Sequence, residues 1–221
     1  MQTMSFDDWV RAWFDHPESI GTLDVDPLPF CIAESELEWV SPEDTLWYLP
    51  EPTMISYASQ LFQHAGKLLA DYSDIQVDHG FRRLITEGDT PLNVLCNTQV
   101  ALDTRRACIE AIYYIYKDVF AHRENIVCLS YMWWDIFPIS PACFAAADAP
   151  SLISAVFNVL EQTLALPSQA CQSGALHGLT LWEGADTERA LGIIEVFLAT
   201  HAVPYPEWVT YVNNVRTWRA L

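Results

Sequence analysis

Apolar residues recur three and four positions apart along most of this chain, as one buried face of an α-helix requires. Strand-like alternation of comparable strength is not present. A first helix is expected after Ser5, with Asp8 completing its cap, and a second is expected to begin at Thr53. Later helices are expected over the ranges 98–120, 150–165, 168–183, 187–201 and 206–219.

Turn residues divide these periodic stretches and support the same interpretation. Thr90 and Pro91 are typical of a helix start, because threonine caps and proline fits the first turn. Pro167 and Gly184 mark helix ends. The pattern predicts an all-α fold: one domain over residues 1–221, built of antiparallel helices as HEAT-like pairs or as an irregular bundle. A repeat of fixed period is not visible.

Residues 16–52 have a different character, because they are rich in proline and in acidic residues. This segment is expected to be extended and loop-rich, with a short helix near 34–39 or 42–48. It carries six prolines, at positions 17, 27, 29, 42, 50 and 52.

Composition excludes two classes of protein. Of the 221 residues, 51% are hydrophobic, which a disordered chain would not contain. The formal net charge is −18, and a surface of that charge repels phosphates, so direct binding of nucleic acid is not expected.

The negative charge is concentrated near the start of the chain. Residues 1–80 hold 15 acids and two bases, a net charge of −13. Acids and aromatics alternate within the proline-rich segment, and this favours a docking face for a basic partner. Simple solubility is the alternative. The predicted partner-binding residues are Asp24, Asp26, Glu34, Glu36, Glu38, Trp39, Glu43, Asp44 and Trp47.

The cysteines and the apolar runs bear on compartment. The six cysteines lack a Cys-x-x-Cys pair and lie mostly in apolar runs, so we interpret them as reduced core residues. No secretory signal is visible, and the cytoplasm is expected. Residues 126–147 are apolar but contain Asp135 and two prolines, which is unfavourable in lipid. We expect them to be buried core, and no membrane contact is predicted.

Catalytic and metal-binding motifs are weak throughout. None of the six histidines has zinc-ligand spacing, and no cofactor is predicted. His177 follows small residues at 171, 174 and 175, so a packed histidine reaching a carbonyl or carboxylate is the main interpretation, with a catalytic role open. Asp135 is expected to cap a turn or to pair with Arg123 or Arg106. Trp133 and Trp134 point about 100° apart on a helix, so that one can face the core and the other a surface. A structural role is the main interpretation, and an exposed tryptophan that serves as a binding anchor is the alternative.

Three runs carry a resemblance: 72–81, 131–138 and 175–182. They resemble a group of uncharacterised bacterial all-helical proteins, over most of the chain beyond about residue 50. In that group the last run usually continues Leu-Gly-His-Trp, whereas Thr180 and Leu181 replace Gly-His here. The departure argues against chemistry that needs a second histidine. Proteins of this sort are suspected of being immunity proteins encoded beside toxin genes.

The expected function is therefore that of a non-enzymatic immunity protein, which binds a cognate toxin with a basic active-site cleft through its acidic, aromatic-containing surface. Two other classes stay open. One is a helical scaffold or effector-loading adaptor that binds without inhibiting. The other is an enzyme with a pocket around His177 or Asp135.

Overall fold

The computed structural model describes residues 4–16, 49–86, 90–201 and 206–217. All regular elements in these ranges are helical, which confirms the all-α prediction. The α-helices are α1 (Phe6–Phe14), α2 (Glu51–Leu68), α3 (Asp74–Thr86), α4 (Leu102–Asp118), α5 (Val127–Ile136), α6 (Ala149–Leu164), α7 (Gln169–Trp182), α8 (Thr187–Thr200) and α9 (Pro206–Arg216).

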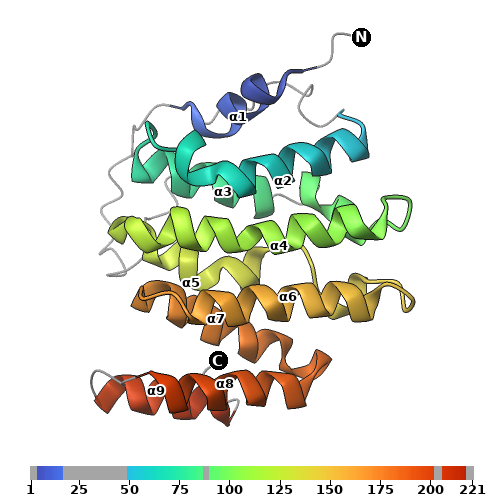
Figure 1. Cartoon of the computed structure of the whole chain (residues 1–221). Helices are drawn as coiled ribbons and strands as arrows, with labels where there is room; N and C mark the ends of the chain where they lie inside the picture. The colour runs from blue at the N-terminus through green and yellow to red at the C-terminus, as the bar shows by residue number, and fades with distance from the viewer. Residues whose placement is uncertain (1–3, 17–48, 87–89, 202–205, 218–221) are drawn as a thin grey trace.

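The helices form a stack two layers deep (Figure 1). In the front layer α2 packs along α4, α4 along α6, and α6 against α8. Behind them α3 packs on α5, α5 on α7, and α7 on α9, while α1 covers α3 at one end. The front helices run in one direction in Figure 1 and the rear helices return, so each successive pair is antiparallel. Antiparallel helices in a single domain are what the sequence predicts.

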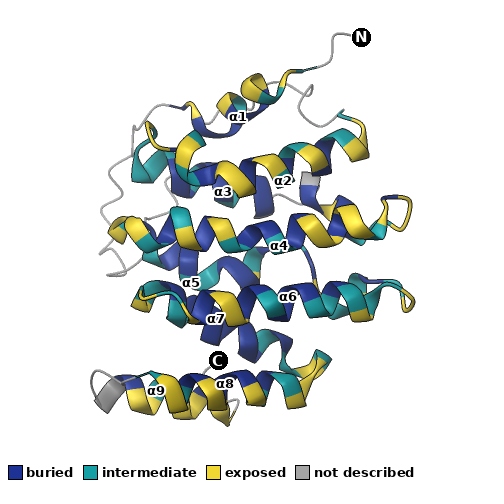
Figure 2. Cartoon of the chain, in the orientation of Figure 1, coloured by how far each residue is buried: buried dark blue, intermediate teal, exposed yellow. Residues whose placement is uncertain are grey.

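An aromatic centre joins the two layers. The ring of Trp133, fully buried in α5, packs edge-on against Phe62, Phe81 and Phe120, with centroids 5.6–6.2 Å apart. Edge-to-face contacts of this kind stabilise the fold beyond the free energy gained by burying the rings. Trp134 is also buried, which agrees with the structural role and overturns the alternative of an exposed tryptophan anchor. Figure 2 shows buried residues along the inner faces of the stack and exposed residues along its front.

The helices begin and end close to the residues predicted from capping and proline positions. The Ser5 hydroxyl accepts from the Asp8 backbone N–H, and the Thr90 hydroxyl from that of Leu92, as predicted. However, α2 begins at Glu51 rather than Thr53, because Pro52 fits its first turn. Residues 51–52 therefore belong to a helix and not to the loop-rich segment.

Close approach of α5 and α7 explains the small residues of α7. A Cβ atom added to Gly174 would lie 2.4 Å from the Ser130 carbonyl oxygen, and one added to Gly178 would lie 2.5 Å from the Trp134 ring. Only glycine leaves room for these contacts. The predicted close packing against this stretch is confirmed.

One disulfide corrects the prediction that every cysteine is reduced. Cys96, at the end of the 3₁₀ helix Pro91–Cys96, is bonded to Cys143 across a sequence separation of 47 residues. Cys108 and Cys171 are free and buried. Cysteine spacing alone does not reveal that these two chain segments meet beside the stack.

No helix within the described ranges is both long and apolar enough to cross a membrane.

Candidate functional site

The predicted docking residues lie outside the described residues. All nine, from Asp24 to Trp47, fall in the range 17–48. Their assignment stays a prediction, and the candidate sites below come from the described helices.

Most arginines of the described helices are held by carboxylates of the same chain. Arg82 pairs with Asp78 at 2.8 Å and Arg123 with Asp74 at 2.9 Å, both partly buried. Arg11, Arg105, Arg106 and Arg216 are also in ion pairs. Acids that face water without an arginine partner, such as Glu161 and Glu188, therefore dominate the exposed charge of this part of the chain.

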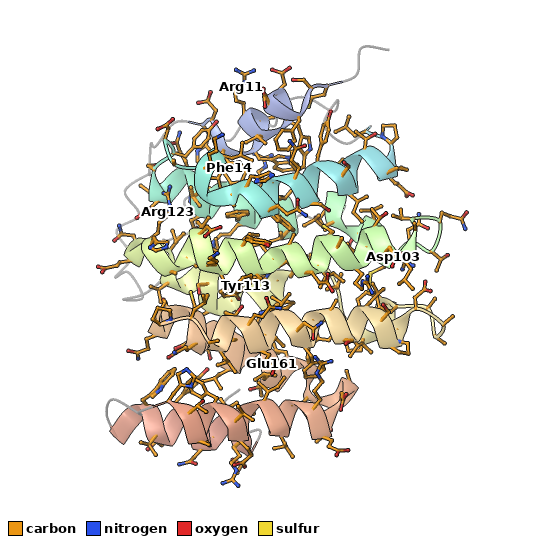
Figure 3. The ribbon with its side chains drawn as sticks, in the orientation of Figure 1. Arg11, Phe14, Asp103, Tyr113, Arg123 and Glu161 are labelled. Atoms are coloured by element: carbon orange, nitrogen blue, oxygen red, sulfur yellow. A yellow bond between two sulfur atoms is a disulfide. The ribbon has the colours of Figure 1, made fainter. Side chains whose placement is uncertain are left out.

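Arg123 stabilises the fold and does not pair with Asp135. Its guanidinium donates to the backbone carbonyls of Leu69 and Tyr72 as well as to Asp74, which fixes the connection between α2 and α3. A hollow of about 440 Å³ adjoins it (Figure 3 labels Arg123). Since Arg106 pairs with Asp103 and Glu110, neither arginine expected for Asp135 is its partner.

The partner of Asp135 is His177. Nε2 of His177 lies 2.6 Å from the Asp135 carboxylate, and its ring stacks on Tyr131 with centroids 4.3 Å apart. Asp135 lies in the last turn of α5 and His177 in the middle of α7, so the pair joins two helices of the rear layer. The prediction that His177 reaches a carboxylate is confirmed.

The surroundings of His177 limit its chemistry. His177 is 5% exposed, and its Nδ1 atom is buried without a hydrogen-bond partner among the described residues. Tyr211 of α9 covers the same region, where burial raises the pKa of its hydroxyl. A general base needs a ring nitrogen facing its substrate, whereas here one nitrogen binds Asp135 and the other is enclosed.

A groove crosses the front layer where α4 lies between α2 and α6. It has a volume of about 440 Å³, and its walls bear amides, tyrosines and one carboxylate: Gln63, Ala107, Glu110, Ala111, Tyr113, Tyr114, Asn158 and Gln162. Tyr113 lies between α4 and α6 in Figure 3. The volume is within the range of about 300–1,000 Å³ found for small-ligand sites.

The two tyrosines give this groove its chemical character. Their rings meet edge-on at 5.6 Å, and Tyr114 is 39% exposed. The Lys117 ammonium stands 5.9 Å from the centre of the Tyr114 ring, within cation–π distance. The sequence contained this signal, because Tyr113, Tyr114 and Lys117 lie on the side of α4 opposite its apolar stripe.

In the described ranges, no cluster of three or more histidine, cysteine or acidic side chains is arranged to hold a metal ion. No known protein family, curated protein or solved structure matches this chain. The resemblance to bacterial helical proteins therefore stays a prediction.

Proposed function

We propose that this protein is a bacterial immunity protein, which binds and neutralises a cognate toxin through an acidic, aromatic-containing surface. The observation that carries the proposal is the charge distribution of the described helices. Their arginines are largely held in internal ion pairs, which leaves acids such as Glu161 facing water (Figure 3). The acidic segment 16–52 adds further negative charge.

The proposed partner is an enzyme with a basic active-site cleft that ordinarily binds nucleic acid or nucleotides. Opposite charges speed the encounter of two proteins, and aromatic side chains supply much of the lasting contact energy. Binding across such a cleft excludes the natural substrate. Neutralisation then requires no chemistry from the immunity protein itself, and the enclosed setting of His177 supports a non-enzymatic role.

The compartment is part of the proposal. The cytoplasm was expected from reduced cysteines, and the Cys96–Cys143 disulfide weighs against it, because disulfides are rare in the reducing cytosol. Alkylating free thiols in intact cells before lysis tests this point. Blocked Cys96 and Cys143 would support the cytoplasm, and unmodified residues would place the protein in an oxidising compartment.

Co-expression with the product of the adjacent gene tests the function. We expect rescue of growth, co-purification, and inhibition of the purified partner. Binding without inhibition would instead identify a scaffold or adaptor. Turnover of a substrate that is lost in His177→Ala would identify an enzyme.

Charge reversal tests the docking surface. Replacing several of the predicted acids by lysine is expected to slow association and to flatten its dependence on salt, because long-range attraction is lost. Unchanged binding and protection would contradict the assignment. The acids to replace are Asp24, Asp26, Glu34, Glu36, Glu38, Glu43 and Asp44.

A further inference from the structure

The geometry of the front groove points to a second contact surface: we propose that the groove between α2, α4 and α6 binds an extended segment of a partner protein through an arginine side chain of that segment. The partner class rests on the proposed function. The groove itself rests on four features of the described helices, namely one carboxylate, two tyrosine rings, unpaired amides and an open face.

Glu110 supplies the charge that a guanidinium requires. It lines the groove, and its side chain is 43% exposed. Its ion-pair partner Arg106 lies 3.9 Å away, at the outer limit of such contacts, and is held more closely by Asp103 at 3.5 Å. The Glu110 carboxylate therefore keeps capacity to accept hydrogen bonds from an incoming guanidinium.

Tyr114 supplies a surface on which a cation stacks. Lys117 places its ammonium 5.9 Å from the centre of this ring, so the ring face is open to a cation. A planar guanidinium suits an aromatic face better than an ammonium, because it stacks and is less strongly hydrated. Tyr113, with its ring 5.6 Å away, extends the aromatic wall.

Amides supply groups that match a peptide backbone. Gln63 and Gln162 both line the groove, and their side chains make no hydrogen bond within the described part of the chain. Asn158 accepts from Arg189 through Oδ1 at 2.6 Å, which leaves its Nδ2 group as a donor. Donors and acceptors from α2 and α6 thus flank the tyrosines of α4 on both sides, as an extended chain crossing the helices requires.

An uncharged sugar is the competing occupant, because amides and tyrosines also suit carbohydrate. The charge of the lining favours the arginine, because Glu110 is the one charged residue among the described residues that line the groove, and it is negative. The two occupants differ in what they predict, since only a cationic segment depends on the Glu110 charge.

A labelled decapeptide of alternating arginine and serine, with its glutamate counterpart, tests the groove by fluorescence anisotropy at about physiological salt. The protein is the full chain with the acids of the proline-rich segment changed to amides, so that this segment does not compete. The changed residues are Asp24, Asp26, Glu34, Glu36, Glu38, Glu43 and Asp44.

We expect the arginine peptide to bind and the glutamate peptide not to bind. Glu110→Gln and Tyr114→Ala should each weaken binding by roughly two- to fivefold, as one exposed ion pair or one stacking contact contributes. Tyr114→Phe keeps the ring and should bind nearly as the parent does. Glu188→Gln, an equal loss of charge on exposed α8, is the matched control and should have no specific effect.

Equal losses in Glu110→Gln and Glu188→Gln would overturn the proposal, since they would show general attraction of a cation to an acidic protein. Binding of an uncharged oligosaccharide that Tyr114→Ala abolishes and Glu110→Gln leaves intact would overturn it in favour of sugar. Failure of the protein to inhibit any partner, with peptide binding intact, would instead count against the proposed function alone.

Discussion

Single buried polar side chains tie distant parts of the stack together. The Arg105 side chain is 1% exposed, donates to the Val100 carbonyl, and pairs with Asp148 just before α6. It therefore connects the entrance of α4 with the entrance of α6. A buried guanidinium is costly without its carboxylate, because the charge is then desolvated and uncompensated.

The first prediction concerns this pair. Asp148→Ala should lower the free energy of unfolding by about 3 kcal/mol, the lower end for a broken buried pair, because the Asp148 side chain is still 21% exposed. Urea denaturation measures it. Asp103→Ala is the control: its pair with Arg106 is exposed and should contribute below about 1 kcal/mol. Equal losses from the two variants would show that burial of Arg105 does not govern the effect.

The second prediction concerns His79, whose ring stacks on His16 with centroids 5.7 Å apart. Burial lowers the pKa of His79 below 6.5, opposed by the nearby Asp78 and assisted by His16 and Arg82. The unfolded chain then takes up the proton first, so this stability is present above about pH 6.5 and is lost as the pH falls through the lowered pKa.

Unfolding measured from about pH 8 to about pH 5 tests the sign. The wild-type chain should lose more stability over this range than His79→Asn, which has no imidazole to protonate. Parallel pH profiles would contradict the assignment. Many acids also titrate towards low pH, and the comparison with the variant removes their shared contribution.

At the scale of the element, the close contacts between helices depend on glycine residues, which have no side chain to separate the two backbones. The third prediction is that Gly174→Ala lowers the free energy of unfolding by about 1–3 kcal/mol, because the new methyl group meets the Ser130 carbonyl and forces α5 from α7. Gly192 of α8 has no heavy atom within 4 Å of such a methyl group. Gly192→Ala should therefore stabilise by about 0.5–1 kcal/mol through helix propensity. Thermal unfolding of both variants measures the contrast, and a loss in Gly192→Ala would refute it.

Helices were predictable here because each is specified locally. The capping hydroxyls of Ser5 and Thr90 and the terminator Pro167 act within a few residues, so the sequence places their helices to within a turn or so. What lies opposite a helix is not local. Trp134 is buried because α7 presents Gly178 to it, a fact of the tertiary packing that the pattern in 131–138 does not contain.

At the scale of the whole molecule, the Cys96–Cys143 disulfide closes a loop that includes α4 and α5. The fourth prediction is that Cys96→Ser with Cys143→Ser lowers stability by roughly 2–4 kcal/mol, because the unfolded chain regains the freedom that the crosslink removes. Chemical denaturation with and without reductant measures it. Reductant should destabilise the double variant less than the parent, although Cys128 is also disulfide-bonded and keeps some response in both, and an equal response from both proteins would contradict the prediction.

The candidate sites divide in the same way between what is local and what is tertiary. The pair of half-buried Tyr113 and exposed Tyr114 departs visibly from the apolar stripe of α4, whereas the amides that complete the groove come from α2 and α6. Asp135 and His177, 42 residues apart, meet only because α5 and α7 approach closely. The sequence names such residues and their chemistry, and the fold decides which of them share a surface.

The stack also has a consequence for how such a chain can change length. Each helix pair meets mainly the pairs before and after it, so no single centre has to be rebuilt when a pair is added. Duplicating the segment that encodes one pair would lengthen the front face by one helix while leaving the groove over α4 intact. A protein of this architecture can therefore acquire a wider contact surface by duplication within its gene, one pair at a time.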